Sequence, residues 1–121
     1  MMKKIVYICH PVSGDVKGNM EKIRDISRSI NLSHPDICPI APYFLDCHAM
    51  DDNSRVERSR GIRNGIYLFD RKVMDEVWLY GDRISKGMNY EILKAHDMGI
   101  PVVPKSEELK QLFLQMIKAA A

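Results

Sequence analysis

Four short apolar runs rich in β-branched residues alternate along the chain with segments whose apolar residues recur at helical spacing. The runs cover residues 4–9, 37–41, 75–80 and 100–103. Each gap between them is long enough for a helical crossover, so the alternation predicts a parallel sheet with helices on both faces. Pro101 favours an edge position for the fourth strand. We therefore expect an α/β fold of three layers, flavodoxin-like or Rossmann-like, formed by one domain over residues 1–121.

Polar residues at the start of each helical pattern predict where the helices begin. The predicted N-cap residues are Asn19, Ser54, Ser85 and Ser106. Glu57 follows Ser54 at the spacing of a capping box, and Gly99 is a typical residue to end the helix that Ser85 opens. Residues 42–53 are polar and too long for a turn, so we expect an irregular connection that serves as a lid or a subunit contact.

Composition argues against several functional classes. Apolar residues make up 45% of the chain and charged residues 28%, and Lys plus Arg (18) exceed Asp plus Glu (16) by only two, which gives no electrostatic case for a nucleic-acid partner. No run approaches the length of a membrane span, so we expect no membrane partner and a cytoplasmic protein. Cys9, Cys38 and Cys47 lack CxxC spacing, and the four histidines are scattered. We therefore expect reduced thiols, no metal and no cofactor.

Ligands of parallel α/β sheets bind beyond the carboxyl ends of the strands. In this chain that rule gathers the loops after Cys9, Ala41 and Tyr80. We expect a small-molecule site there. Its candidate binding residues are Tyr7, His10, Ser13, Gly14, Tyr43, Gly81, Ser85, Gly87 and Met88.

Glu91 is the residue of this region best suited to chemistry. Helical side chains lean toward the helix N-terminus, so Glu91 reaches over Gly87, which has no side chain to fill the space. Glu91 is not at the capping-box position after Ser85, and its i+4 neighbour Ala95 offers no ion pair. We therefore take Glu91 as the first catalytic candidate. The alternative is a solvent-facing helix glutamate, with Ser85 acting only as a cap.

Other polar and aromatic residues allow two interpretations each. His10 is either an acid–base group poised near neutrality or a strand-end residue bonded to nearby backbone. Tyr43 is better placed than Trp78 to stack on a base, because Trp78 lies within the third strand and is expected in the core. Three aspartates of the long connection are either all solvated turn formers or include one that enters the ligand-binding site: Asp46, Asp51 and Asp52.

A motif after the third strand resembles one of a known superfamily. Ser85, Gly87, Tyr90 and Glu91 have the spacing of Ser-x-Gly-x-x-Tyr-Glu-Leu. In this the chain resembles the nucleoside 2-deoxyribosyltransferase-like superfamily, which includes the 2-deoxynucleoside 5-monophosphate N-glycosidases. It looks closer still to an uncharacterised branch found in bacteria and phages, through Tyr7-Ile8-Cys9, Ser13-Gly14-Asp15, Pro39-Ile40-Ala41-Pro42, Glu57-Arg58, Asp75-Glu76-Val77-Trp78 and Gly81-Asp82-Arg83-Ile84-Ser85.

The resemblance implies a reaction and an assembly. Glu91 would attack the anomeric carbon of a deoxyribosyl group, giving a glycosyl-enzyme that water or another base resolves. The resemblance also implies a homo-oligomer, a dimer or larger.

Two positions depart from the pattern of the relatives. Tyr67 stands where they carry an assisting Asp, and it shares a helical face with Arg60 and Asn64. Asn64 and Tyr67 are therefore candidates to position a sugar or base, although Tyr67 alternatively packs in the core. The first loop lacks the arginine with which the monophosphate glycosidases read phosphate, and the amides of Ser13 and Gly14 are left as candidates to hold an anion.

The resemblance implies a nucleoside-binding or nucleotide-binding protein that cleaves or transfers at an N-glycosidic bond, an N-glycosidase or N-deoxyribosyltransferase with Glu91 as nucleophile. The alternative is a noncatalytic nucleotide sensor or sequestering protein of phage or bacterial origin, which the missing Asp favours. A purely structural or scaffolding role is the third possibility.

Overall fold

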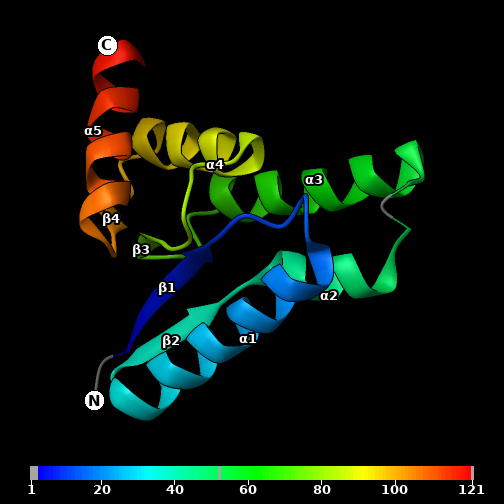
Figure 1. The fold of residues 1–121 in the computed structure, drawn as a ribbon, viewed down its shortest axis with the longest axis horizontal. Coiled ribbons are helices and arrows are strands. Elements are labelled where there is room, and N and C mark those ends of the chain that lie inside the picture. Colours follow the sequence, from blue (N-terminus) through cyan, green and yellow to red (C-terminus); the bar gives the residue numbers. More distant parts are fainter. Residues whose placement is uncertain (1–2, 52, 121) are drawn as a thin grey trace.

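The computed structural model describes residues 3–51 and 53–120, and it contains a four-stranded parallel sheet (Figure 1). The strands lie in the order β2-β1-β3-β4 and comprise β1 (Lys4–Cys9), β2 (Ile37–Ile40), β3 (Glu76–Leu79) and β4 (Val102–Pro104). The helices are α1 (Val16–Ser33), α2 (Pro42–Ala49), α3 (Arg55–Asp70), α4 (Lys86–Asp97) and α5 (Glu107–Ala120). The predicted α/β class is confirmed.

Side chains alternate between the two faces of the sheet and build two hydrophobic clusters. On one face, Tyr7, Cys9, Val77 and Leu79 pack with Phe69 of α3 and with residues of α4 and α5. On the other face, Val6, Ile8 and Trp78 pack with Met20, Ile23 and Ile30 of α1. Helices therefore cover both faces, which gives the expected three layers.

Trp78 is a core residue, as predicted, with 7% of its surface exposed. Its indole Nε1 donates to Glu76 at 2.9 Å, and the Lys105 ammonium lies 3.8 Å from its ring centroid. The His34 ring meets it edge-on at 6.2 Å. Trp78 is thus enclosed by polar groups at the rim of the α1 face.

Most predicted boundaries are confirmed within one or two residues. The hydroxyls of Ser54, Ser85 and Ser106 each accept a hydrogen bond from the amide three residues later, at 3.3, 3.3 and 3.2 Å. Gly99 follows α4 with φ +72°, a conformation that favours glycine. β4 begins one residue after Pro101 and lies at an edge of the sheet, as expected.

Asn19 was the wrong cap for the first helix. α1 begins at Val16, and the Asp15 side chain accepts from the Gly18 amide. Asn19 is buried one turn into the helix, where its Nδ2 donates to the Val12 carbonyl at 3.0 Å. Two potential caps lie four residues apart, and Asn19 instead fastens the preceding loop to α1.

The irregular connection predicted for residues 42–53 is also wrong. Residues 42–49 form α2, with Pro42 at its start, where a missing amide hydrogen costs nothing. Tyr43, Phe44 and Cys47 of this helix pack against the α1-side cluster. Contacts of these three partly buried side chains hold the helix against the rest of the protein.

The α2–α3 hairpin, residues 42–51 and 53–70, buries few of its side chains. Of the described residues of α3, Phe69 alone is buried, whereas Val56, Ile62 and Tyr67 are 79%, 54% and 57% exposed. The end of α2 and the start of α3 extend well beyond the sheet (Figure 1). Within the described part of the chain, no helix is both long and apolar enough to cross a membrane.

Candidate active site

Glu91 lies in the second turn of α4 and faces the end of β1. The Tyr7 hydroxyl donates a hydrogen bond to Glu91 Oε2, and the Cys9 thiol lies 3.7 Å from Oε1, within the range of a weak S–H donor. Tyr7 and Cys9 are two residues apart on one strand, so their side chains leave the same face of the sheet. One carboxylate is thus held through both of its oxygens, and the solvent-facing alternative for Glu91 is wrong.

Burial is the main electrostatic influence on this group of side chains. Removal from water raises the pKa of Glu91 to about 7, against the opposing effect of the hydrogen bonds from Tyr7 and Cys9. Burial, and then the negative charge of Glu91, raise the pKa of the Tyr7 hydroxyl and of the Cys9 thiol well above their ordinary values. Both donors therefore keep their protons at neutral pH, while Glu91 can ionise near that pH.

Tyr43, on α2, belongs to the same group of side chains as Tyr7, Cys9 and Glu91. Its hydroxyl donates to the Ile8 carbonyl at 2.6 Å, and its ring centroid lies 5.8 Å from that of Tyr7. Burial, followed by the charge of Glu91, raises the pKa of the Tyr43 hydroxyl well above its ordinary value. Tyr43 is thus placed beside Tyr7, and its role in stacking on a base remains a prediction.

The loops after β1 and β3 meet at the carboxyl ends of these strands. His10 is buried, with Nδ1 donating to the Pro11 carbonyl at 2.6 Å, and burial lowers the pKa of its ring. The backbone-bonded interpretation of His10 is confirmed by this contact. Gly81 has φ +101°, and a Cβ there would lie 2.7 Å from Pro11 Cδ, so a glycine is required where the β3 loop meets the β1 loop.

Arg83 lies in the loop after β3, and from the sequence it stood out only as part of the Gly81-Asp82-Arg83-Ile84-Ser85 motif. Its guanidinium donates to the Ser13 carbonyl at 3.0 Å and would lie 3.7 Å from a Cβ on Gly14. Ser13 and Gly14 are both exposed. The Arg83 guanidinium of the β3–α4 loop therefore lies beside the loop after β1. This contact joins two loops, so the spacing of residues within either loop could not predict it.

Asn64 and Tyr67 are not joined to Glu91 by any hydrogen bond among the described residues. Asn64 Nδ2 donates to Asp46 Oδ2 at 3.4 Å, and the Tyr67 hydroxyl accepts from Arg71 at 2.6 Å. The Arg71 guanidinium also lies 4.9 Å from the Tyr67 ring centroid. At 57% exposure, Tyr67 does not pack in the core, so that alternative is wrong. Both residues are engaged within the α2–α3 hairpin.

The aspartates of the long connection lie in different settings. Asp46 is half-buried beside Asn64, and Asp51 accepts from the Asn53 amide at 2.9 Å as a turn former. Asp52 lies outside the described residues.

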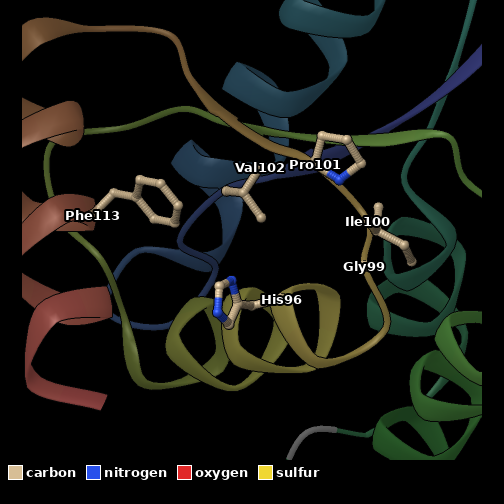
Figure 2. A pocket seen from close by; sticks show the side chains of 6 residues that line it. All are labelled: His96, Gly99, Ile100, Pro101, Val102 and Phe113. Carbon is tan, nitrogen blue, oxygen red and sulfur yellow. The ribbon is translucent and has the colours of Figure 1, made fainter. Parts of the chain in front are cut away.

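The space over Gly87 is open, as expected: a Cβ there would have no atom within 4 Å. A separate hollow of about 290 Å³ lies between α4, β4 and α5. Figure 2 shows His96, Val102 and Phe113 among the residues that line it. A wider groove of about 500 Å³ runs between the start of α4 and α5 and includes Lys86 and Leu112. Neither of these hollows includes Glu91.

The comparisons with known proteins agree with this architecture. Residues 4–105 match the model of a family described as a domain of unknown function, DUF7768. The chain belongs to this DUF7768 family. A comparison with curated protein sequences gave no match.

A solved structure resembles the DUF7768 domain in fold. It comes from work entitled "Characterization of 2-deoxyribosyltransferase from psychrotolerant bacterium Bacillus psychrosaccharolyticus: a suitable biocatalyst for the industrial synthesis of antiviral and antitumoral nucleosides". The TM-score is 0.62 at 15% sequence identity, over 83% of this chain and 70% of the other. At this identity the likeness establishes a shared fold, and membership of the superfamily expected from the sequence stays a prediction. Membership of a bacterial and phage branch stays a prediction.

Proposed function

We propose that this DUF7768 domain binds a nucleoside or nucleotide at the carboxyl ends of its strands and cleaves or transfers at the N-glycosidic bond, with Glu91 as the nucleophile. The observation that carries the proposal is the partly buried Glu91 carboxylate held by Tyr7 of β1. A carboxylate that is withdrawn from water, oriented and still ionisable near neutral pH suits attack on a carbon that develops positive charge.

The chemistry needs Glu91 in its ionised form. Its carboxylate would attack the anomeric carbon, while the base leaves with the electrons of the C–N bond and takes up a proton. Water or a second base then attacks the glycosyl ester and restores the carboxylate. Because the pKa of Glu91 is about 7, turnover should rise with pH through that region.

We also infer a cytoplasmic homo-oligomer. Support comes from α3, where Val56 and Ile62 are exposed on a helix that buries little of its own surface. Light scattering would report a dimer or larger species, and Ile62→Asp would reduce it to a monomer. A strict monomer in the unmodified protein would contradict this inference.

The deciding experiment is a mass-spectrometric assay of the purified protein with pooled nucleosides, deoxynucleoside monophosphates and NAD-derived nucleotides. The unmodified protein should release free base, and Glu91→Gln should keep its fold and bound ligand but lose turnover. Glu108→Gln, the same change at an exposed position of α5, is the matched control and should retain full turnover. Turnover unchanged in Glu91→Gln would contradict the proposal.

The second candidate is a noncatalytic nucleotide-binding protein. It is favoured by Tyr67, which occupies the position of the assisting carboxylate and is bound to Arg71. Such a protein would retain its ligand through purification and return it intact after denaturation. The same assay distinguishes the two, because only an enzyme produces free base. Failure to bind any member of the pool would favour the scaffolding role.

A further inference from the structure

Cys9 is a buried thiol that the proposed reaction leaves without a role. It is the last residue of β1, it is fully buried, and its backbone carbonyl accepts from the Tyr80 amide at 2.9 Å. The strand therefore fixes its backbone. Its Sγ lies 3.7 Å from Glu91 Oε1, on the opposite oxygen from the one that Tyr7 contacts.

We propose that Cys9 is a positioning residue for Glu91, whose thiol hydrogen holds Oε1 while the Tyr7 hydroxyl holds Oε2. The contact itself is a claim about the folded protein, and its meaning for catalysis rests on the proposed function. With two donors on one rigid strand, the carboxylate is restrained against rotation about its terminal bond. A reactive group held in one orientation loses less freedom when the substrate arrives.

The thiol acts as a donor and not as a nucleophile. Burial, together with the charge of Glu91, favours the protonated form of Cys9, and a thiolate beside a carboxylate would place two negative charges in contact. The proton therefore stays on sulfur while Glu91 ionises, and no bond to Cys9 forms or breaks.

The other titratable groups that face Glu91 do not compete with this role. Tyr7 of β1 and Tyr43 of α2 are neutral at neutral pH, since burial raises the pKa of both hydroxyls. On α4 itself, the Lys94 ammonium is paired with Asp70 of α3 at 2.6 Å. Changes in how Glu91 ionises after substitution of Cys9 can thus be assigned to the lost or altered donor.

The expected effect is a shift in the pH at which Glu91 ionises. Cys9→Ala removes a donor to the ionised form, so the midpoint should rise by about half a unit, a modest change because a thiol is a weak donor. Cys9→Ser supplies a stronger donor of similar size, so its midpoint should return to or fall below the original value. Cys38→Ala, on β2 and paired with Ile5 at the other end of β1 from Cys9, should leave the midpoint unchanged.

The measurement is an NMR titration of ¹³C-labelled glutamate side-chain carboxyls, in which Glu91 is assigned by its absence in Glu91→Gln. It needs no substrate, so it stands apart from the activity assay. Equal midpoints in the unmodified protein, Cys9→Ala and Cys9→Ser would overturn the inference and leave Cys9 as packing only. Midpoints that shift as expected, in a protein that turns over no substrate, would support the contact and overturn the proposed function.

A second measurement covers the case in which substitutions of Cys9 prevent folding. In a Cys38→Ala, Cys47→Ala protein, the remaining S–H stretching band in the Raman spectrum belongs to Cys9. That band should shift in frequency over the pH range in which Glu91 ionises, since a carboxylate accepts a hydrogen bond more strongly than a carboxylic acid. A band that does not respond to pH would overturn the inference. If the protein is an active enzyme, the midpoint of the acid limb of its kcat/KM profile against pH should shift in Cys9→Ala by the same amount as the NMR midpoint. In Cys9→Ser that midpoint should return to its original value.

Discussion

Helices α3 and α4 differ in what holds them to the molecule. The 12 residues of α4 bury Met88, Ile92 and Ala95 against the sheet, whereas the 16 residues of α3 bury Phe69 alone. Helical stability in proteins comes mainly from packing of an apolar face, so the shorter helix should be the firmer one. The candidate nucleophile lies on the firmly packed helix, and the exposed apolar surface lies on the other.

The largest expected difference between the two helices comes from one substitution made in each. Ile92→Ala removes a fully buried side chain and should lower the free energy of unfolding by about 2–5 kcal/mol. Ile62→Ala, at 54% exposure, should change it by less than about 0.5 kcal/mol. Denaturant unfolding of both variants under conditions that keep the protein monomeric checks this, and equal losses would show that α3 is as well packed as α4.

The buried carboxylate of α4 should make stability depend on pH. Folding raises the pKa of Glu91 from its ordinary 4.5 to about 7, so between these values the folded chain binds more protons than the unfolded chain. Stability contributed by the protonated group is therefore lost as pH rises from about 4.5 to about 7.

Glu91→Gln has no such loss. At pH 8 the free energy of unfolding of the variant should be higher than that of the unmodified protein by on the order of 3 kcal/mol, because each pKa unit corresponds to about 1.36 kcal/mol. At pH 4 the difference should be small. Thermal unfolding at the two pH values measures it. If Glu91→Gln is no more stable than the unmodified protein at pH 8, Glu91 is in contact with water.

Equivalent N-caps should contribute unequally to the global stability of the protein in the two helices. Ser85 and Ser54 each accept an amide hydrogen bond at 3.3 Å. Ser85→Ala should cost about 1 kcal/mol of global stability. Ser54→Ala should cost less, because the start of α3 can open locally without unfolding the core. Hydrogen exchange of the first-turn amides should show faster local opening in Ser54→Ala, and a global loss equal to that of Ser85→Ala would count against this view.

The smallest expected effect separates packing from function. A Cβ on Gly87 of α4 or on Gly65 of α3 meets no atom within 4 Å, so both Gly→Ala changes should stabilise the fold by about 0.5–1 kcal/mol. Only Gly87→Ala should reduce ligand binding or turnover, since the space over Gly87 is where the ligand is expected. Equal retention of activity in both variants would remove Gly87 from the site.

Much of the fold could be predicted because its signals are local. Short apolar runs rich in β-branched residues predicted the four strands, and the serine caps were correct because each bond spans three residues. Asn19 was misassigned because Asp15, one turn earlier, competes for the same role. The helix of residues 42–49 was missed because its apolar residues are not concentrated on one face, which leaves no helical periodicity to read.

The candidate site was predictable only in part. Glu91 could be selected because the gap over Gly87 depends on positions along a single helix. Its contacts with Tyr7 and Cys9 span more than 80 residues of sequence and depend on how α4 is set against β1. The alternation of side chains along β1 does place Cys9 on the same face as Tyr7, which is the signal that could have identified it.

The enclosure of Trp78 gives this protein an intrinsic optical reporter. The chain has a single tryptophan, so all indole fluorescence arises from one position. That position lies on the α1 face of the sheet, away from the face on which Tyr7 and Cys9 meet Glu91. Its emission should therefore report loss of the core during unfolding while staying nearly constant when a ligand enters at Glu91, so that one unlabelled sample separates a damaged fold from an altered site.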